Sequence, residues 1–191
     1  MEIVCLLGSP RLNGNSCTLA KEFCDTAQSL GADVRTFALN KLQYQGCQAC
    51  MACKTKLDHC IINDDLTEVL QSVAEADILV MATPTYYGEV SSQLKAFIDR
   101  TYSYLVPDFI DSPNPSRLLP GKQMVFIQAQ GYPDENYYSD VFPKYAKFFR
   151  WYGFEDCHCI RVCGVNKPND VAIREDVLSQ ARQTAQKIVK R

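Results

Sequence analysis

Short apolar runs alternate along the chain with longer segments in which apolar and polar residues recur at helical spacing. The short runs predict strands at 2–7, 34–39, 77–82, 122–129 and 154–162, of which 2–7 and 77–82 are typical of strands buried on both faces of a sheet. The longer segments predict helices, at 16–30, from 63 or 64 onward, and at 92–105, 136–152 and 172–190. This alternation predicts an α/β fold, a three-layer sandwich with a five-stranded parallel sheet.

The segment 106–121 interrupts the alternation with four prolines and no clear period. It is long for a connection within a compact domain, so we expect a lid or a contact between subunits there. Trp151 and the predicted helix around it are expected in the core. No internal repeat and no linker divides the chain, so residues 1–191 are expected to form one domain.

The amino-acid composition of the chain limits the kinds of partner that it can bind. The 191 residues are 47% hydrophobic and 22% charged, as in globular proteins, and the formal net charge is -2. Without a net basic field we expect no nucleic acid and no anionic membrane as partner. No apolar run approaches the roughly 20 residues of a membrane span. The N-terminus shows no secretory signal, so a cytoplasmic location is expected. Ten cysteines in such a chain indicate metal, cluster or redox chemistry rather than disulfides.

The turn after the first predicted strand has the composition of an anion-binding loop. Residues 8–18 read GSPRLNGNSCT and lead into a helix N-terminus, where free N–H groups and the helix dipole attract a phosphate. Hydroxyls of Ser9, Ser16 and Thr18 add hydrogen bonds, and Arg11 adds charge. The loop lacks the Lys-Ser/Thr pair of triphosphate loops and the glycine spacing of dinucleotide sites, so a single terminal phosphate fits. The plainer alternative is a strand-to-helix turn with a serine cap.

Two further loops follow predicted strands and are expected at the same edge of the sheet. Residues 83–90 read TPTYYGEV, in which the paired tyrosines offer flat faces to a ring system, and residues 128–133 read QAQGYP. Taken alone, the two tyrosines would be interpreted as packing residues. Together with the anion-binding loop, they favour a site in which three loops at one sheet edge hold a phosphate and a flat heterocycle. Glu89 is expected to be a surface residue.

Three motifs together resemble the NAD(P)H-dependent FMN reductase family of flavodoxin-like proteins: GSPR with GNS at 8–16, PTYYG at 84–88 and LKAFIDR at 94–100. The resemblance implies a flavodoxin-like fold, FMN as cofactor, NAD(P)H as cosubstrate and a homodimer or homotetramer. It implies that the FMN phosphate is held by Ser9, Arg11, Asn15, Ser16 and Thr18. It also implies that the isoalloxazine ring is lined by Pro84, Thr85, Tyr86, Tyr87 and Gly88, with Gln130 and Gly131 at its rim. Asp99 and Arg100 would serve helix packing or subunit contact.

Four cysteines lie close together with the spacing C-x2-C-x2-C-x6-C, namely Cys47, Cys50, Cys53 and Cys60. Steps of three residues let one loop turn its thiolates toward a common centre, which suits an iron–sulfur cube. Zinc, which usually takes two separated cysteine pairs, and an empty redox-active thiol loop are the alternatives. The spacing resembles the iron–sulfur flavoprotein branch of the family, which implies that the four cysteines bind a [4Fe–4S] cluster close to FMN. The other six cysteines are expected to pack in the core, and His59 to be solvated.

These features predict an FMN-dependent oxidoreductase. Electrons would pass from NAD(P)H through FMN, with the cluster as a further carrier, to a small acceptor such as a quinone or free flavin. One alternative is a non-enzymatic electron carrier or redox sensor that takes its electrons from ferredoxin. Another is a thiol switch that binds FMN only structurally. No side chain is required as acid or base, so no catalytic residue is named.

Overall fold

A five-stranded parallel sheet forms the centre of the computed structural model, which describes residues 1–190. The strands lie in the order β2-β1-β3-β4-β5, and every neighbouring pair is parallel. Their bounds are β1 Glu2–Leu7, β2 Asp33–Ala38, β3 Ile78–Pro84, β4 Lys122–Ala129 and β5 Phe154–Val162. The predicted α/β sheet is confirmed, and its strand order is that of a flavodoxin-like fold.

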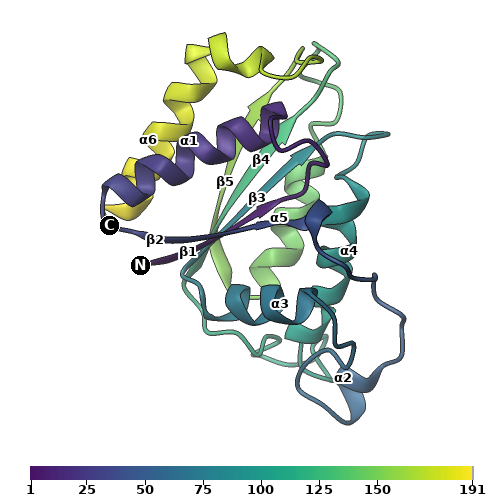
Figure 1. The fold of residues 1–191 in the computed structure, drawn as a ribbon. Coiled ribbons are helices and arrows are strands. Elements are labelled where there is room, and N and C mark those ends of the chain that lie inside the picture. Colours follow the sequence, from purple (N-terminus) through teal and green to yellow (C-terminus); the bar gives the residue numbers. More distant parts are fainter. Residues whose placement is uncertain (191) are drawn as a thin grey trace.

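Helices cover both faces of this sheet (Figure 1). One face carries α1 (Asn15–Ser29) and α6 (Glu175–Val189), and the other carries α3 (Leu66–Glu75), α4 (Ser92–Arg100) and α5 (Val141–Trp151). Alternate strand residues divide the core between the faces, because successive side chains of a strand point to opposite sides. Cys5 of β1 packs with α1 and α6, whereas Leu6 packs with the other three helices. None of the helices within 1–190 has the length and apolar character needed to cross a bilayer.

Two helices are shorter than the sequence pattern predicts. α4 ends at Arg100 and continues as a 3-10 turn over Thr101–Tyr104, so the predicted helix 92–105 is wrong beyond residue 100. α5 begins only at Val141, because Tyr138 has a left-handed φ of +63° and turns the chain just before it. The predicted core position of Trp151 is also wrong, since this side chain is 43% exposed at the end of α5.

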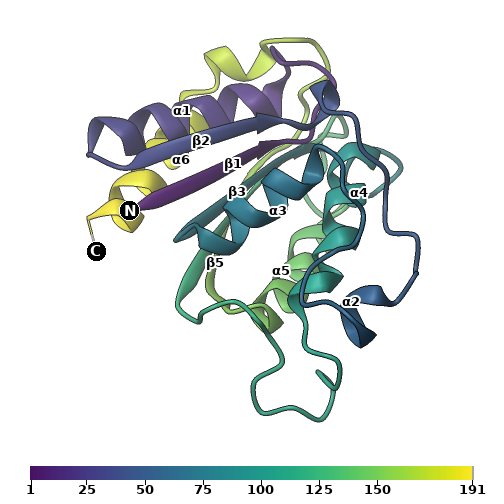
Figure 2. The ribbon, with the colours of Figure 1, turned by 60° about the horizontal axis from the view of Figure 1, so that its bottom comes forward.

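The proline-rich segment 106–121 leaves the body of the fold as a long loop, seen at the bottom of Figure 2. Its ends are joined, because Val106 N donates to Pro115 O (2.9 Å) and Arg117 N donates to Tyr104 O (2.7 Å). The loop therefore leaves the fold and returns to it at one place, where its two ends are hydrogen-bonded together.

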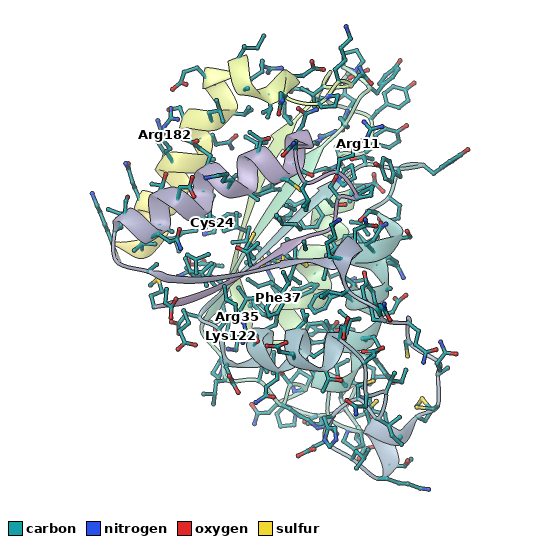
Figure 3. All side chains as sticks on the ribbon, viewed as in Figure 1. Arg11, Cys24, Arg35, Phe37, Lys122 and Arg182 are labelled. Carbon is teal, nitrogen blue, oxygen red and sulfur yellow. The ribbon has the colours of Figure 1, made fainter. Side chains whose placement is uncertain are left out.

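The six cysteines outside the clustered motif fall into two groups. Cys5, Cys17 and Cys24 are buried between α1 and the sheet, as predicted for packing residues, and Figure 3 shows Cys24 on α1. The three others, which are Cys157, Cys159 and Cys163, are only half-buried on and after β5. Burial raises the pKa of Cys159 to about 11, which disfavours the thiolate, the reactive form of a cysteine.

Candidate functional site

The loop between β1 and α1 is packed tightly against two other elements at the carboxyl edge of the sheet. Gly8 N donates to Ala82 O (2.8 Å), and Ser91 Oγ donates to Gly8 O (2.6 Å). A Cβ on Gly8 would lie 2.9 Å from Leu94 Cβ and 3.0 Å from Ala82 O, so glycine is required there. β3 and α4 therefore hold the loop in one conformation before the chain enters α1.

The N-terminus of α1 is open to an anion. Gly14 precedes the first helical residue, Asn15, and no side chain caps the helix, so its first N–H groups are available. Arg11 leaves the loop just ahead of this terminus (Figure 3), and its backbone N donates to Ser9 Oγ (3.1 Å). Free N–H groups, the helix dipole and a nearby guanidinium together favour a phosphate.

A cavity of about 470 Å³, called the FMN cavity below, opens at this edge of the sheet. It is within the range of about 300–1,000 Å³ that small-molecule sites occupy. Most of the residues predicted to contact FMN line it, namely Ser9, Arg11, Asn15, Ser16, Pro84, Thr85, Tyr86 and Gly131. The structure thus brings the loops after β1, β3 and β4 together, and the FMN contacts themselves stay a prediction.

The remaining residues predicted to contact FMN do not line this cavity. Thr18 lines a separate cavity under α1, and its hydroxyl donates to a carbonyl at the start of the helix (3.2 Å). Tyr87 is fully exposed with a left-handed φ of +51°, and Gly88 follows with a φ of +76°. Gln130 is buried and donates to two carbonyls of the loop after β4, at 2.8 and 3.1 Å. These four residues shape the loops around the cavity.

The loop between β5 and α6 forms a wall of the cavity that the sequence analysis missed. This wall consists of Val165, Asn166, Lys167 and Pro168, and the β4 loop and its continuation add Tyr132, Pro133 and Tyr138. Asn15 fastens the new wall, because its Nδ2 donates to Lys167 O (3.0 Å) and its Oδ1 accepts from Val171 N (3.1 Å). The signal was available, since this loop also follows the carboxyl end of a strand.

Glu89 fixes the turn that carries Tyr86. The two residues exchange backbone hydrogen bonds, Tyr86 N to Glu89 O (2.9 Å) and Glu89 N to Tyr86 O (3.0 Å). The Glu89 carboxylate pairs with Lys144 and accepts a hydrogen bond from Tyr145 Oη (3.0 Å). Burial opposes the charge, but these partners outweigh it and lower the pKa of Glu89. Glu89 is therefore a support of the cavity rather than the plain surface residue predicted.

The segment with the clustered cysteines lies beyond the C-terminal end of α4 and includes a short helix, α2 (Ala52–Thr55), which carries Cys53 and which the sequence did not predict (Figure 1). All four line one cavity of about 180 Å³, called the sulfur cavity below: Cys47, Cys50, Cys53 and Cys60. Ala49 and Met51 flank Cys50 with left-handed φ values of +51° and +58° although neither is glycine. Such strained residues persist only where the surrounding structure holds them, and they concentrate at functional sites.

Three buried or half-buried cations hold the cysteine loop in place. Arg100 donates to the carbonyls of Gln45 (3.0 Å) and Ile62 (2.9 Å), on either side of the cysteines. Lys54 of the loop donates to the Leu105 carbonyl (2.7 Å), and Arg117 donates to both Leu105 O (2.6 Å) and Cys53 O (2.9 Å), so the two cations dock the loop onto the segment after α4. Burial lowers the pKa of Lys54, because charging it there costs free energy. Arg100 therefore has a structural role, as predicted, and this role is to hold the cysteine loop in place.

The cysteine loop and the FMN cavity lie at opposite ends of α4. Ser91 precedes the helix and binds Gly8, whereas Arg100 ends it and binds the cysteine loop. The helix has nine residues, which span about 14 Å at 1.5 Å per residue. Whether the cysteines and a bound flavin would lie close together stays a prediction. Over residues 1–190, no group of three or more Cys, His, Asp or Glu side chains is arranged to hold a single metal ion.

Comparison with known proteins identifies the family. The sequence pattern of the NADPH-dependent FMN reductase family matches residues 1–135. The chain belongs to this family. It is 34% identical over 101 residues to an iron–sulfur flavoprotein of Methanocaldococcus jannaschii and 33% identical over 101 residues to one of Methanosarcina thermophila. The alignments cover 53% of this chain and 52% of each relative, so the chain spans about half the length of the curated relatives it matches.

Solved structures share the fold of this FMN reductase family member over nearly its whole length. The NAD(P)H:quinone oxidoreductase of Methanothermobacter marburgensis has a TM-score of 0.77 at 16% identity, covering 98% of this chain and 96% of that one. An FMN-dependent NADH-azoreductase of Bacillus anthracis in complex with FMN has a TM-score of 0.73 at 18% identity, covering 99% and 100%. At such identities the likeness shows the fold alone. The comparisons therefore give the chain's family, that of the FMN reductases, and its fold.

Proposed function

We propose that this chain binds FMN in the FMN cavity and uses NAD(P)H to reduce a small acceptor such as a quinone or free flavin. The observation that carries the proposal is the convergence of the uncapped N-terminus of α1 with the loops after β3, β4 and β5 around one cavity. Bound FMN would take a hydride from the nicotinamide and pass the electrons to the acceptor.

The walls of the FMN cavity suit different parts of the cofactor. The N–H groups of α1, the hydroxyls of Ser9 and Ser16 and the Arg11 charge bind the phosphate. Pro84 and Tyr86 offer apolar and aromatic surface to the isoalloxazine. The bonds of Glu89 keep that surface in place, so the chain's main contribution is orientation of the cofactor.

We propose further that the sulfur cavity binds a [4Fe–4S] cluster through Cys47, Cys50, Cys53 and Cys60. Two of the relatives reported above carry the name iron–sulfur flavoprotein, which supports an iron–sulfur site. Backbone turned by left-handed residues forms N–H concavities found at many iron–sulfur sites, and Ala49 and Met51 supply such turns. Lys54 and Arg100 lie at the cysteine loop, and their positive charges would offset the negative charge of the cluster. A [4Fe–4S] cube binds one thiolate at each of its four irons. Its four sulfur ligands therefore lie farther apart than the ligands of a single metal ion.

Absorption spectra with iron and sulfide assays, on protein purified without oxygen, test both proposals. We expect flavin bands after addition of FMN and about four irons per chain, as in a cubane. Cys50→Ser should lose the iron and keep the flavin. Cys163→Ser, a half-buried cysteine outside the sulfur cavity, should keep both. Flavin without iron contradicts the cluster alone, and no flavin after addition of FMN contradicts the central proposal.

Reduction of the flavin by each nicotinamide nucleotide separates a reductase from an electron carrier. Rapid bleaching of the flavin bands by NADH or NADPH supports the proposed reaction and shows which donor is preferred. No bleaching with either nucleotide, together with reduction by a ferredoxin system, would make the chain an electron carrier. Light scattering on the same preparation measures whether the protein is the homodimer or homotetramer that we propose.

A further inference from the structure

Two cations line the FMN cavity, and only Arg11 belongs to the phosphate site proposed above. The other is Lys167, an exposed residue of the loop between β5 and α6. Within residues 1–190 neither side-chain charge takes part in an ion pair or a hydrogen bond. None of the described residues that line the cavity is an aspartate or a glutamate. Lys167 therefore adds a positive charge that the protein itself does not neutralise.

The backbone of Lys167 is held from three directions. Its carbonyl accepts a hydrogen bond from Asn15 Nδ2 (3.0 Å), and its N donates to Asp170 Oδ2 (2.7 Å). The same carboxylate oxygen accepts from Asn166 N (2.8 Å), so Asp170 closes the turn that carries Lys167. Pro168 follows and restricts the backbone conformation of the residue before it. The Lys167 side chain therefore starts from a fixed place.

That place is the N-terminus of α1. Asn15 is the first residue of this helix, and its hydrogen bond to Lys167 O brings the β5–α6 loop against the first turn, as Figure 2 shows. Arg11 leaves the preceding loop at the same terminus (Figure 3). Ser16, only 2% exposed, lines the cavity from the first turn of the helix. An uncapped helix N-terminus, a buried serine and two cations thus meet at one end of the cavity.

We propose that Lys167 binds the FMN phosphate as a second cation besides Arg11, and that Asn15 acts by holding Lys167 in place. The inference rests on the proposed function, because it needs FMN in the FMN cavity. A phosphate monoester carries a charge of about -1.5 to -2 at neutral pH, so one guanidinium leaves part of this charge uncompensated. Lys167 supplies the missing charge from the wall that the sequence analysis did not include.

Asn15 has its own partners, which favour a positioning role over direct contact with the phosphate. Its Nδ2 donates to Lys167 O, and its Oδ1 accepts from Val171 N (3.1 Å). Both ends of the amide therefore bind the β5–α6 loop. The resemblance to the family implied that Asn15 holds the phosphate itself, and the present proposal replaces that contact by one through Lys167.

Fluorescence titration of the flavin-free full chain with FMN and with riboflavin tests the role of Lys167. We expect Lys167→Gln to weaken FMN binding about tenfold, because a charge-assisted bond to phosphate is lost, and to change riboflavin binding less than about twofold. Lys167→Arg keeps the charge and should bind FMN within about threefold of the parent. Lys187→Gln removes an exposed lysine of α6 outside the cavity and should bind both flavins like the parent.

Three outcomes are distinguishable. A parent chain that binds neither flavin contradicts the proposed function. A parent chain that binds FMN, together with a Lys167→Gln variant of equal FMN affinity, overturns the role of Lys167 alone. NADPH carries a phosphate monoester of the same chemistry on its ribose. A Lys167→Gln variant with parent FMN affinity and a higher KM for NADPH but not for NADH would assign Lys167 to the donor and overturn the inference.

Asn15→Ala, made in the parent and in Lys167→Gln, tests the positioning role. If Asn15 acts through Lys167, its loss should weaken FMN binding about threefold or more in the parent and less than about twofold in the Lys167→Gln background. Equal losses in the two backgrounds would mean that Asn15 contributes independently, which overturns its positioning role. Circular dichroism shows whether each variant is folded, and Lys167→Gln at its exposed position decides the role of Lys167 even where Asn15→Ala does not fold.

Discussion

Arg100 and Asp64 form an ion pair at the neck of the cysteine loop, with 2.9 Å between Arg100 Nη1 and Asp64 Oδ2. The Arg100 side chain is 0% exposed and that of Asp64 is 13% exposed. The same carboxylate accepts hydrogen bonds from Gln45 N (3.2 Å) and Leu66 N (3.0 Å). One buried pair thus joins the start of the loop, its end and the beginning of α3.

Replacement of Asp64 by Asn should destabilise the protein strongly. Removing one partner of a buried ion pair leaves an uncompensated charge, which costs about 3–5 kcal/mol. Urea unfolding of the two proteins measures the loss. Asp99→Asn is the matched control, because the Lys95–Asp99 pair of α4 is 44% and 45% exposed and should contribute less than about 1 kcal/mol. Equal losses in the two variants would contradict the role of the buried pair.

The contribution of Asp64 should disappear in acid. Burial raises the pKa of Asp64, but the hydrogen bonds from Arg100 and Gln45 N outweigh it and hold the pKa below its usual range. A carboxyl with a depressed folded pKa stabilises above its unfolded pKa of about 3.9 and loses this contribution as the pH falls through the folded value. Unfolding free energies measured from pH 7 to pH 2 should show the gap between parent and Asp64→Asn constant down to about pH 4, then closing.

Gly8→Ala should weaken both the fold and FMN binding. The new Cβ would lie 2.9 Å from Leu94 Cβ and 3.0 Å from Ala82 O, so the phosphate loop must shift. Overpacking of this kind costs about 1–3 kcal/mol. Gly46→Ala is the control, because the nearest atom to its Cβ would be 3.8 Å away. Thermal unfolding and FMN titration of both variants check this, and a Gly8→Ala protein with parent affinity would show that the loop conformation is not needed.

The central strands β1 and β3 were predictable because a strand buried on both faces has an unbroken apolar run, and Ile78–Pro84 is buried almost throughout. The end of α4 depends on a single backbone conformation, which carries no comparable signal. The start of α5 did have one, because Pro143 fits the first turn of a helix but not the interior of a helix that begins at 136. Tyr138 is left-handed although nothing in its neighbourhood of the sequence distinguishes it from helical tyrosines.

The candidate sites also have parts that the sequence pattern predicts and parts that depend on contacts formed only in the folded chain. Loops after parallel strands meet at one edge, which is why most of the FMN cavity could be predicted from position alone. The β5 loop, CGVNKPND at 163–170, has a single glycine and no hydroxyl side chain, unlike the first loop, and so it was missed. The bonds of Arg100 to Gln45 and Ile62 span 55 and 38 residues of sequence, and only the folded chain shows them.

Lys54→Met should loosen the cysteine loop without unfolding the sheet. Lys54 Nζ donates to Tyr102 O (2.6 Å) and Leu105 O (2.7 Å) and lies 4.1 Å from the centre of the Tyr102 ring. Loss of hydrogen bonds to a charged group costs about 1.5–3 kcal/mol each, so local opening becomes more frequent. Limited proteolysis should cut near residues 47–60 faster than in the parent. Lys56→Met, at an exposed position two residues on, should be cut at the parent rate, and equal rates in both variants would contradict the docking role.

Ser16→Glu should abolish FMN binding while the protein remains folded. Ser16 is buried at the start of α1 and lines the FMN cavity, so the new carboxylate would occupy the place proposed for the phosphate. A negative charge at a helix N-terminus is itself favourable, which preserves α1. Fluorescence titration should show FMN affinity reduced about 100-fold or more, as expected when a charge-assisted bond is replaced by repulsion.

Ser29→Glu, at the exposed end of the same helix, should bind FMN like the parent. Riboflavin, which lacks the phosphate, should lose much less affinity than FMN in Ser16→Glu, and an equal loss for both ligands would mean that Ser16 does not lie at the phosphate.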